Sequence, residues 1–218
     1  MTNRLRNAAL TSFLLATAAC GSSPIAPTAT TPGPDPAPAA CNANQYQPNY
    51  VAELNLLNTV KYPSWPIRAY IEEPELTRRG YSDARRTFIV QAIMRGLSAW
   101  ARRTDGKVGQ VVATSDFSQA TLTVVFRNQQ DGQLGAVTHE SSGGAVRVSR
   151  MVLNVDYIES RVGADRLWEY TPAHEMGHAL GIVGHPSSAQ SIMAPFVGDF
   201  REPQLVDTNS ILVKYSCP

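Results

Sequence analysis

The sequence lacks a large excess of charge of either sign. Its 218 residues include 19 Lys and Arg against 18 Asp and Glu, which gives a formal net charge of +1. A chain without a strong positive field has no electrostatic footprint for a phosphate backbone, so we expect no nucleic-acid partner. Charged residues make up only 17% of the chain, whereas the 43% of apolar residues is enough for a packed core. The length suits one folded domain with processing segments.

Long apolar runs are also absent, and the sequence predicts no transmembrane helix. The apolar stretch near the N-terminus covers only residues 8–19 and follows two cations, Arg4 and Arg6. A short apolar segment behind a positively charged end is typical of an export signal. We therefore expect residues 1–20 to form a signal segment and the mature protein to be exported.

Cysteine is scarce, and the first of the three cysteines directly follows this apolar segment. Residues 14–21, LLATAACG, resemble the lipobox of bacterial lipoproteins, although Thr17 stands where leucine is usual. The resemblance implies that Cys20 is lipidated and becomes the new N-terminus, which would anchor the protein in a bacterial cell envelope. Plain cleavage after an Ala-x-Ala-like site is the alternative, and it would yield a secreted protein.

Residues 21–40 contain few large apolar side chains and consist mainly of Ser, Pro, Thr, Ala and Gly. Such a segment cannot bury a core, so we expect a disordered linker there and a folded catalytic domain at 41–218. Cys41 and Cys217 stand at the two ends of this domain. In an oxidising compartment they could form a disulfide that ties the ends together.

Helical periodicity is clearest in the middle of the domain. Apolar residues recur at helical spacing from Asp83, with Ser82 as N-cap, to about Arg103, which predicts one long helix. A second helix is expected to begin at Thr171 and Pro172 and to end near Gly181. A last helix is expected at about 205–215.

Strand signals fill the remaining parts of the domain. Together with the helices they predict an α+β domain with a mixed sheet rather than a regular βαβ repeat. The strands are expected at 67–71, 108–113 and 120–126, near Val137 and at 146–155, with a loop at 140–144.

Histidine is scarce as well, yet three of the four histidines fall close together, at positions 174, 178 and 185. Positions i and i+4 lie on one face of a helix, so His174 and His178 can bind one ion. Gly181 allows the positive φ with which the chain can leave the helix and bring back His185 as a third ligand. Three imidazoles leave one zinc position open, which is the pattern of a catalytic site rather than a structural one.

Glu175 directly follows the first of these histidines. In this position it would hold a water molecule at the ion rather than bind the ion itself. Zinc lowers the pKa of its water toward about 7 and polarises a carbonyl group, and Glu175 would pass the water proton to the leaving amine. These residues predict a zinc-dependent endopeptidase with one catalytic zinc.

The pattern His-Glu-x-x-His-x-x-Gly, with His185 and Met193 behind it, resembles the metzincin peptidases, and among them the matrixin type. Residues 191–195 resemble the matrixin methionine turn, in which Met193 would lie beneath the metal. The spacing of Leu205, Asp207, Ile211 and Tyr215 is similar to that of the last helix of the family. The sequence departs from the pattern in one place, because three residues rather than two separate Gly181 from His185. We expect Gly184 to absorb the extra residue as a bulge.

The resemblance also implies a metzincin-like fold: a twisted mixed sheet with an antiparallel edge strand, a long backing helix, an active-site helix and a C-terminal helix. An extended peptide or protein substrate would lie along the edge strand, expected near residues 134–139. Ala194, Pro195 and Phe196 would shape the pocket just past the cleavage point. Cys41 lacks the Pro-Arg-Cys-Gly context of the family's propeptide, so we do not expect a cysteine switch.

Several alternatives stay open. Glu202 is the only glutamate after Glu175, and therefore the only candidate for a gluzincin-like third ligand. His139 is interpreted as a solvated loop residue rather than a ligand of a second zinc, and Tyr170 has no assigned role. The protein could instead be a non-catalytic zinc-binding surface lipoprotein or a zinc amidase acting on cell-wall peptides. Membrane contact is expected only through the lipid anchor, and no residue pattern speaks for or against calcium.

Overall fold

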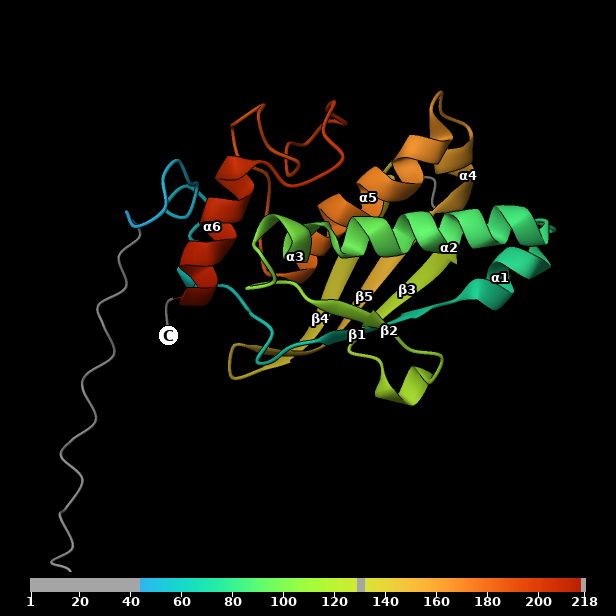
Figure 1. The fold of residues 1–218 in the computed structure, drawn as a ribbon, viewed down its shortest axis with the longest axis horizontal. Helices are drawn as coiled ribbons and strands as arrows, with labels where there is room; N and C mark the ends of the chain where they lie inside the picture. Colours follow the sequence, from blue (N-terminus) through green and yellow to red (C-terminus); the bar gives the residue numbers. More distant parts are fainter. Residues whose placement is uncertain (1–43, 129–131, 217–218) are drawn as a thin grey trace, which may run out of the picture. The chain divides into compact units, whose positions relative to one another are not determined.

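A five-stranded mixed sheet forms the centre of the fold in the computed structural model, which describes residues 44–128 and 132–216 (Figure 1). The strand order is β2-β1-β3-β5-β4. Neighbouring strands are parallel except β4, which runs antiparallel to β5. The strands are β1 (Ile67–Ile71), β2 (Val111–Ala113), β3 (Leu122–Arg127), β4 (Gly135–Ser142) and β5 (Ala145–Asn154).

The predicted antiparallel edge strand is confirmed, because β4 pairs with β5 and ends the strand order. The central strand β3 is buried along nearly its whole length, as expected for a parallel strand covered on both faces. The loop predicted at 140–144 is wrong in its extent. β4 continues to Ser142 with a bulge after Glu140, and Gly143 and Gly144 alone make the turn, at φ 58° and 78°.

Helix α5 packs against α2 on one side and against β4 and β5 on the other (Figure 1). The two helices approach closely at Gly96, where a Cβ atom would overlap the carbonyl oxygen of Glu169 and lie 3.1 Å from the nitrogen of Ala173. The helices are α1 (Glu73–Arg78), α2 (Asp83–Leu97), α3 (Ala99–Arg103), α4 (Val155–Glu159), α5 (Ala164–Ala179) and α6 (Leu205–Ser216), with short 3₁₀ turns at Leu56–Asn58 and Phe117–Gln119.

The prediction for the backing helix is confirmed at its start and corrected near its end. The Ser82 hydroxyl accepts a hydrogen bond from the backbone nitrogen of Arg85 at 3.3 Å, so Ser82 is the N-cap. The helix is not continuous to Arg103, because it breaks at Ser98 between α2 and α3. The last helix, α6, lies where the sequence predicts it.

The predicted start of the active-site helix at Thr171 is wrong. Helix α5 begins seven residues earlier, at Ala164, after Gly163 in the left-handed conformation at φ 81°. Pro172 therefore lies inside the helix, where it has no N–H to donate to the preceding turn. Leu167 and Trp168 are buried and hold the additional turns in the core, and this packing outweighs the missing hydrogen bond.

The expected signal segment, the linker, Cys20 and both Cys41 and Cys217 lie outside the described residues. The predictions of lipidation and of a disulfide therefore stay predictions. Within the described ranges, no helix combines the length and the apolar character that a bilayer span needs.

Candidate metal centre

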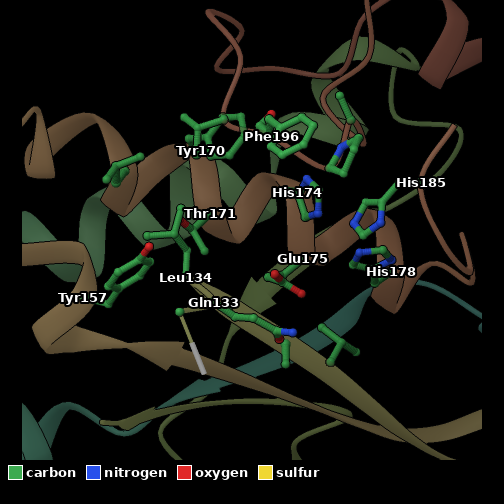
Figure 2. A pocket seen from close by; sticks show the side chains of 18 of the residues that line it. Gln133, Leu134, Tyr157, Tyr170, Thr171, His174, Glu175, His178, His185 and Phe196 are labelled. Carbon is green, nitrogen blue, oxygen red and sulfur yellow. The ribbon is translucent and has the colours of Figure 1, made fainter. Parts of the chain in front are cut away.

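The three predicted ligands meet at one place. One ring nitrogen from each of His174, His178 and His185 lies within 4.8 Å of the other two. Helix α5 supplies the first two from successive turns, and the chain beyond the helix returns the third. Figure 2 shows the three rings facing one another above Glu175. These three histidines could bind a metal ion.

Hydrogen bonds fix which nitrogen of each helical histidine is available. The Nδ1 atom of His174 lies 2.7 Å from the carbonyl oxygen of Ile192, and that of His178 lies 2.6 Å from the carbonyl oxygen of Ile182. A carbonyl oxygen can only accept, so Nδ1 carries the hydrogen and Nε2 keeps its lone pair. Both rings are therefore preset as neutral nitrogen ligands.

Burial favours the same neutral state. It lowers the pKa of His174 to about 3, with a further contribution from the charge of His178. Burial also lowers the pKa of His178 and that of His185. A metal ion needs the neutral imidazole, so the site requires no loss of a proton near pH 7 before an ion binds. His185 is the exposed member of the three, which leaves the centre open to solvent on its side.

The turn that brings His185 back is confirmed at Gly181, which has φ 90° just after α5 ends. Gly184 has φ 84°, so the chain makes a second sharp change of direction immediately before His185. These two glycines thus supply the turns by which the chain passes from the end of α5 to His185. The segment 180–204, here called the ligand loop, contains no helix or strand of its own.

Hydrogen bonds connect the ligand loop to an N-terminal segment and, through that segment, to α6. The Glu53 carboxylate accepts a hydrogen bond from the backbone nitrogen of Ser187 at 2.6 Å. The Thr59 hydroxyl donates to the carbonyl oxygen of Gly181 at 2.6 Å, and the ammonium group of Lys214 donates to Thr59 Oγ1 at 2.5 Å. Contacts from both ends of the described chain thus fix the loop that presents the third ligand.

Met193 lies directly against the ligand-bearing part of α5. Its side chain is fully buried, and a Cβ atom on Gly177 would overlap its sulfur atom and come within 2.7 Å of Trp100. The backbone nitrogen of Ala194 donates to the carbonyl oxygen of Ser191 at 3.2 Å, which closes a tight turn around Met193. Gly177 is therefore required for this packing, because any side chain there would displace the methionine.

A buried carboxylate from α6 supports the same turn. Asp207 is fully buried and accepts hydrogen bonds from the Ser191 hydroxyl and from the backbone nitrogen of Ile192, the latter at 3.0 Å. It also accepts from the backbone nitrogen of Gln204 at 2.7 Å and from the Tyr50 hydroxyl at 3.1 Å. Because the carbonyl group of Ile192 orients the ring of His174, Asp207 acts on the first ligand through the backbone of one residue, Ile192.

Replacing Asp207 with asparagine is expected to weaken metal binding by about 10- to 100-fold, the usual effect of losing an outer partner of a ligand. The amide NH₂ would face donors instead of accepting from them, and the fold should lose about 2–4 kcal/mol of stability. Zinc titration and denaturant unfolding measure the two effects. Asp199→Asn is the control, since Asp199 is exposed in the same loop. Equal zinc affinity in both variants would contradict the role of Asp207.

Glu175 is buried beside the three histidines with nothing to neutralise it. Its side chain is 5% exposed, and its Oε2 atom has no hydrogen-bond partner among the described residues. Burial raises the pKa of Glu175 to about 8. A cation bound at the histidines would lower that pKa again, because it favours the ionised carboxylate. Gly135 on β4 makes room for this side chain, since a Cβ atom there would lie 2.9 Å from Glu175 Oε1.

One pocket of about 810 Å³ contains the three histidines and Glu175 (Figure 2). Ala194, Pro195 and Phe196 line it, as the sequence predicts for the pocket wall. Tyr170 also lines it, and the Tyr170 hydroxyl lies 3.4 Å from the carbonyl oxygens of Ile192 and Phe196. Tyr170, to which the sequence assigned no role, therefore connects α5 to the wall.

The interpretation of His139 as a solvated loop residue is wrong. His139 lies half-buried in β4, where its Nδ1 atom is 2.9 Å from the Ser149 hydroxyl and its Nε2 atom is 3.2 Å from the carbonyl oxygen of His178. Nε2–H thus caps a carbonyl group at the end of α5. Glu202, the alternative third ligand, instead forms an ion pair with Arg102 at 2.7 Å and is not part of the histidine cluster.

Comparisons with known proteins add no assignment. No protein-family model matches the sequence, and a search of curated proteins finds no significant match. The function of the chain therefore has to be inferred from the geometry of this centre.

Proposed function

We propose that the protein is a zinc-dependent endopeptidase of the metzincin type. The observation that carries this proposal is the pairing of three converging imidazoles with a buried, unpartnered carboxylate in one pocket. A purely structural metal site has no use for that carboxylate. Its burial without a partner is costly to stability, and such a cost is typical of groups kept for catalysis.

The donor set supports zinc as the ion. Three neutral nitrogen ligands with one side open to solvent match a catalytic zinc site, which keeps a position for water or substrate. When bound, zinc would act as a Lewis acid: it would lower the pKa of its bound water toward about 7 and polarise the carbonyl group of the substrate.

The protein's own part in the reaction falls mainly to Glu175. The Glu175 carboxylate, which lines the pocket, would accept a proton from the attacking water, and the carboxylic acid so formed would then donate that proton to the leaving amine. Burial keeps bulk water away from this carboxylate, so the proton is retained between the two steps. Gly135 and the apolar packing around α5 hold the side chain in one place.

An extended peptide fits the surroundings of the centre. Gly135, Ala136 and Val137 of the edge strand β4 line the pocket, and no described strand pairs with the outer side of β4. A substrate could therefore add to β4 through main-chain hydrogen bonds. Exposed apolar side chains surround the pocket and would contact the substrate, namely Val162, Val183, Phe196 and Val197.

A metal-removal experiment on the purified full-length chain tests the proposal. We expect one zinc ion per chain by elemental analysis and cleavage of a mixed peptide library at internal bonds. Incubation with a chelator should remove both the zinc and the activity, and added zinc should restore both.

Other outcomes decide between this proposal and its alternatives. Tight zinc binding without cleavage of any peptide or cell-wall fragment would show a non-catalytic zinc protein. Cleavage of cell-wall peptides alone would show an amidase. Cleavage that survives complete removal of zinc would contradict the proposed mechanism.

We further propose that the protein is exported and anchored to the cell envelope by a lipid on Cys20. The support is the sequence of the first 20 residues. Mass spectrometry of the mature N-terminus distinguishes a lipidated Cys20 from plain signal cleavage.

A further inference from the structure

The pocket extends well beyond the metal centre. Its far end is formed by Leu167 and Thr171 of α5 and by Tyr157 and Arg161 of α4 and the turn that follows it. These four residues are here called the distal subsite. Figure 2 shows Tyr157 on the opposite side of Thr171 from the three histidines.

The distance from the metal centre requires a long side chain. Thr171 and Leu167 precede Glu175 by four and eight residues on the same face of α5. At a rise of 1.5 Å per residue they lie roughly 6 and 12 Å further along the helix. A substrate side chain that starts beside the scissile bond would pass Thr171 before it reaches the end of the pocket.

Arg161 gives this end of the pocket a positive charge. Of the pocket-lining residues that the structure describes, it is the one Lys or Arg, and its guanidinium lies 4.1 Å from the centre of the Tyr157 ring. Among the described residues, Arg161 has no ion pair, and Glu175 at the metal end is the only carboxylate that lines the pocket. Other arginines on nearby helices do have carboxylate partners: Arg79 with Glu75, Arg85 with Glu159, Arg95 with Glu169 and Arg102 with Glu202.

A second polar group of the distal subsite also lacks a partner. Thr171 is 2% exposed, and its hydroxyl makes no hydrogen bond with any described residue. A threonine inside a helix usually donates to the carbonyl group one turn back, so this free hydroxyl is unusual. Leu167 adds an apolar side chain to the lining at this end of the pocket.

We propose that the distal subsite binds a glutamate side chain of the substrate, at a position flanking the scissile bond. The methylene stem would run along α5 from Glu175 to Thr171, where the carboxylate would accept a hydrogen bond from Thr171 and pair with Arg161. Leu167 would close the pocket behind it. The ring of Tyr157 holds the guanidinium in place by a cation–π contact. The inference rests on the proposed peptidase function. It adds the preferred substrate, which is a peptide with an acidic residue at that position, and glutamate is preferred to aspartate because its side chain is longer.

The test uses a set of peptides that differ only at the two positions flanking the cleaved bond. At one of the two, kcat/KM for Glu should exceed that for Gln by about two- to five-fold, the range for a solvent-exposed ion pair, and that for Lys by more. Arg161→Gln should make Glu and Gln equal, and Arg161→Glu should reverse the order of Glu and Lys. Arg147→Glu is the matched control, because Arg147 is exposed on β5 and does not line the pocket. It should leave the wild-type order unchanged.

Binding of the same peptides, measured by fluorescence anisotropy, separates the two hypotheses. Preferential binding of Glu peptides that depends on Arg161, without any cleavage, would refute the peptidase but support the subsite. Cleavage with no preference for Glu would overturn the subsite and leave the peptidase standing. The subsite is also overturned if Arg161→Glu, with its zinc content intact, keeps the wild-type order of substrates.

Discussion

Replacing Glu175 with glutamine should reduce peptide cleavage by at least about 100-fold, and up to about 10,000-fold, while zinc remains bound. Glutamine has nearly the same shape as glutamate but cannot accept a proton at the pH of the reaction. The three ligand nitrogens come from other residues, so their geometry should persist. Initial rates on a good library peptide, together with zinc content per chain, measure the effect.

The same substitution should not destabilise the fold, which separates a catalytic role from a structural one. A buried carboxylate without a partner opposes folding, so its neutral replacement should unfold at an equal or higher temperature. Glu73→Gln is the control, since Glu73 is exposed on α1, and its activity should equal that of the wild type. If the Glu175→Gln variant cleaved peptides at the wild-type rate, the general-base role would have to be abandoned.

Replacing Gly181 with alanine should disrupt both folding and metal binding. A residue with a side chain is strained at φ 90°, which costs about 1–2 kcal/mol. The new Cβ atom would also overlap the carbonyl oxygen of Val60 and lie 2.9 Å from Cε of Lys214. Overpacking of this kind adds about 1–3 kcal/mol, and the shift it forces on the ligand loop moves His185. Denaturant unfolding of the metal-free protein and zinc titration measure the two losses.

Gly184 provides a matched control for this variant. It has a similar φ of 84°, but a Cβ atom there would meet only Leu54, at 4.0 Å. Gly184→Ala should therefore lose only the backbone contribution of about 1–2 kcal/mol. If the two variants lost equal stability and equal zinc affinity, the contact between Gly181 and Val60 would not be what positions the third ligand.

The histidine cluster could be predicted from the sequence because it depends on local geometry. The spacing of His174 and His178 is a property of any helix, and the need for a positive φ before His185 follows from the short separation between them. A strand near Val137 and a last helix at about 205–215 were predicted from local pattern in the same way, whereas the place of that strand at the sheet edge came from the family resemblance. All of these features can be recognised without knowing what packs against them.

The start of α5 could not be predicted in this way. Thr171 and Pro172 carry the ordinary signal for the first turn of a helix, yet α5 passes through both. The deciding contacts are tertiary: Trp168 packs edge-to-face on Phe126 at 6.1 Å, and its ring nitrogen donates to Glu159 at 2.9 Å. Both partners, Phe126 and Glu159, lie more than ten residues before Pro172, so a pattern of a few neighbouring residues does not reveal these contacts.

The residues that surround Glu175 were missed for the same reason. Gly135 precedes Glu175 by forty positions and carries no local mark of its role, which is to leave space. His139 looks like a loop residue because the strand around it is half polar. Only the contact between β4 and the C-terminal end of α5 shows that the His139 side chain caps a helix carbonyl group there.

The support of the ligand loop by Lys214 and Asp207 also has a consequence for timing. A polypeptide is synthesised and exported from its N-terminus, so the three histidines leave the ribosome before α6 does. Until α6 follows, Thr59 and the Met193 turn lack the groups that hold them. We therefore expect the proposed peptidase to remain inert until its last helix has been synthesised, which would protect the producing cell without a separate inhibitor.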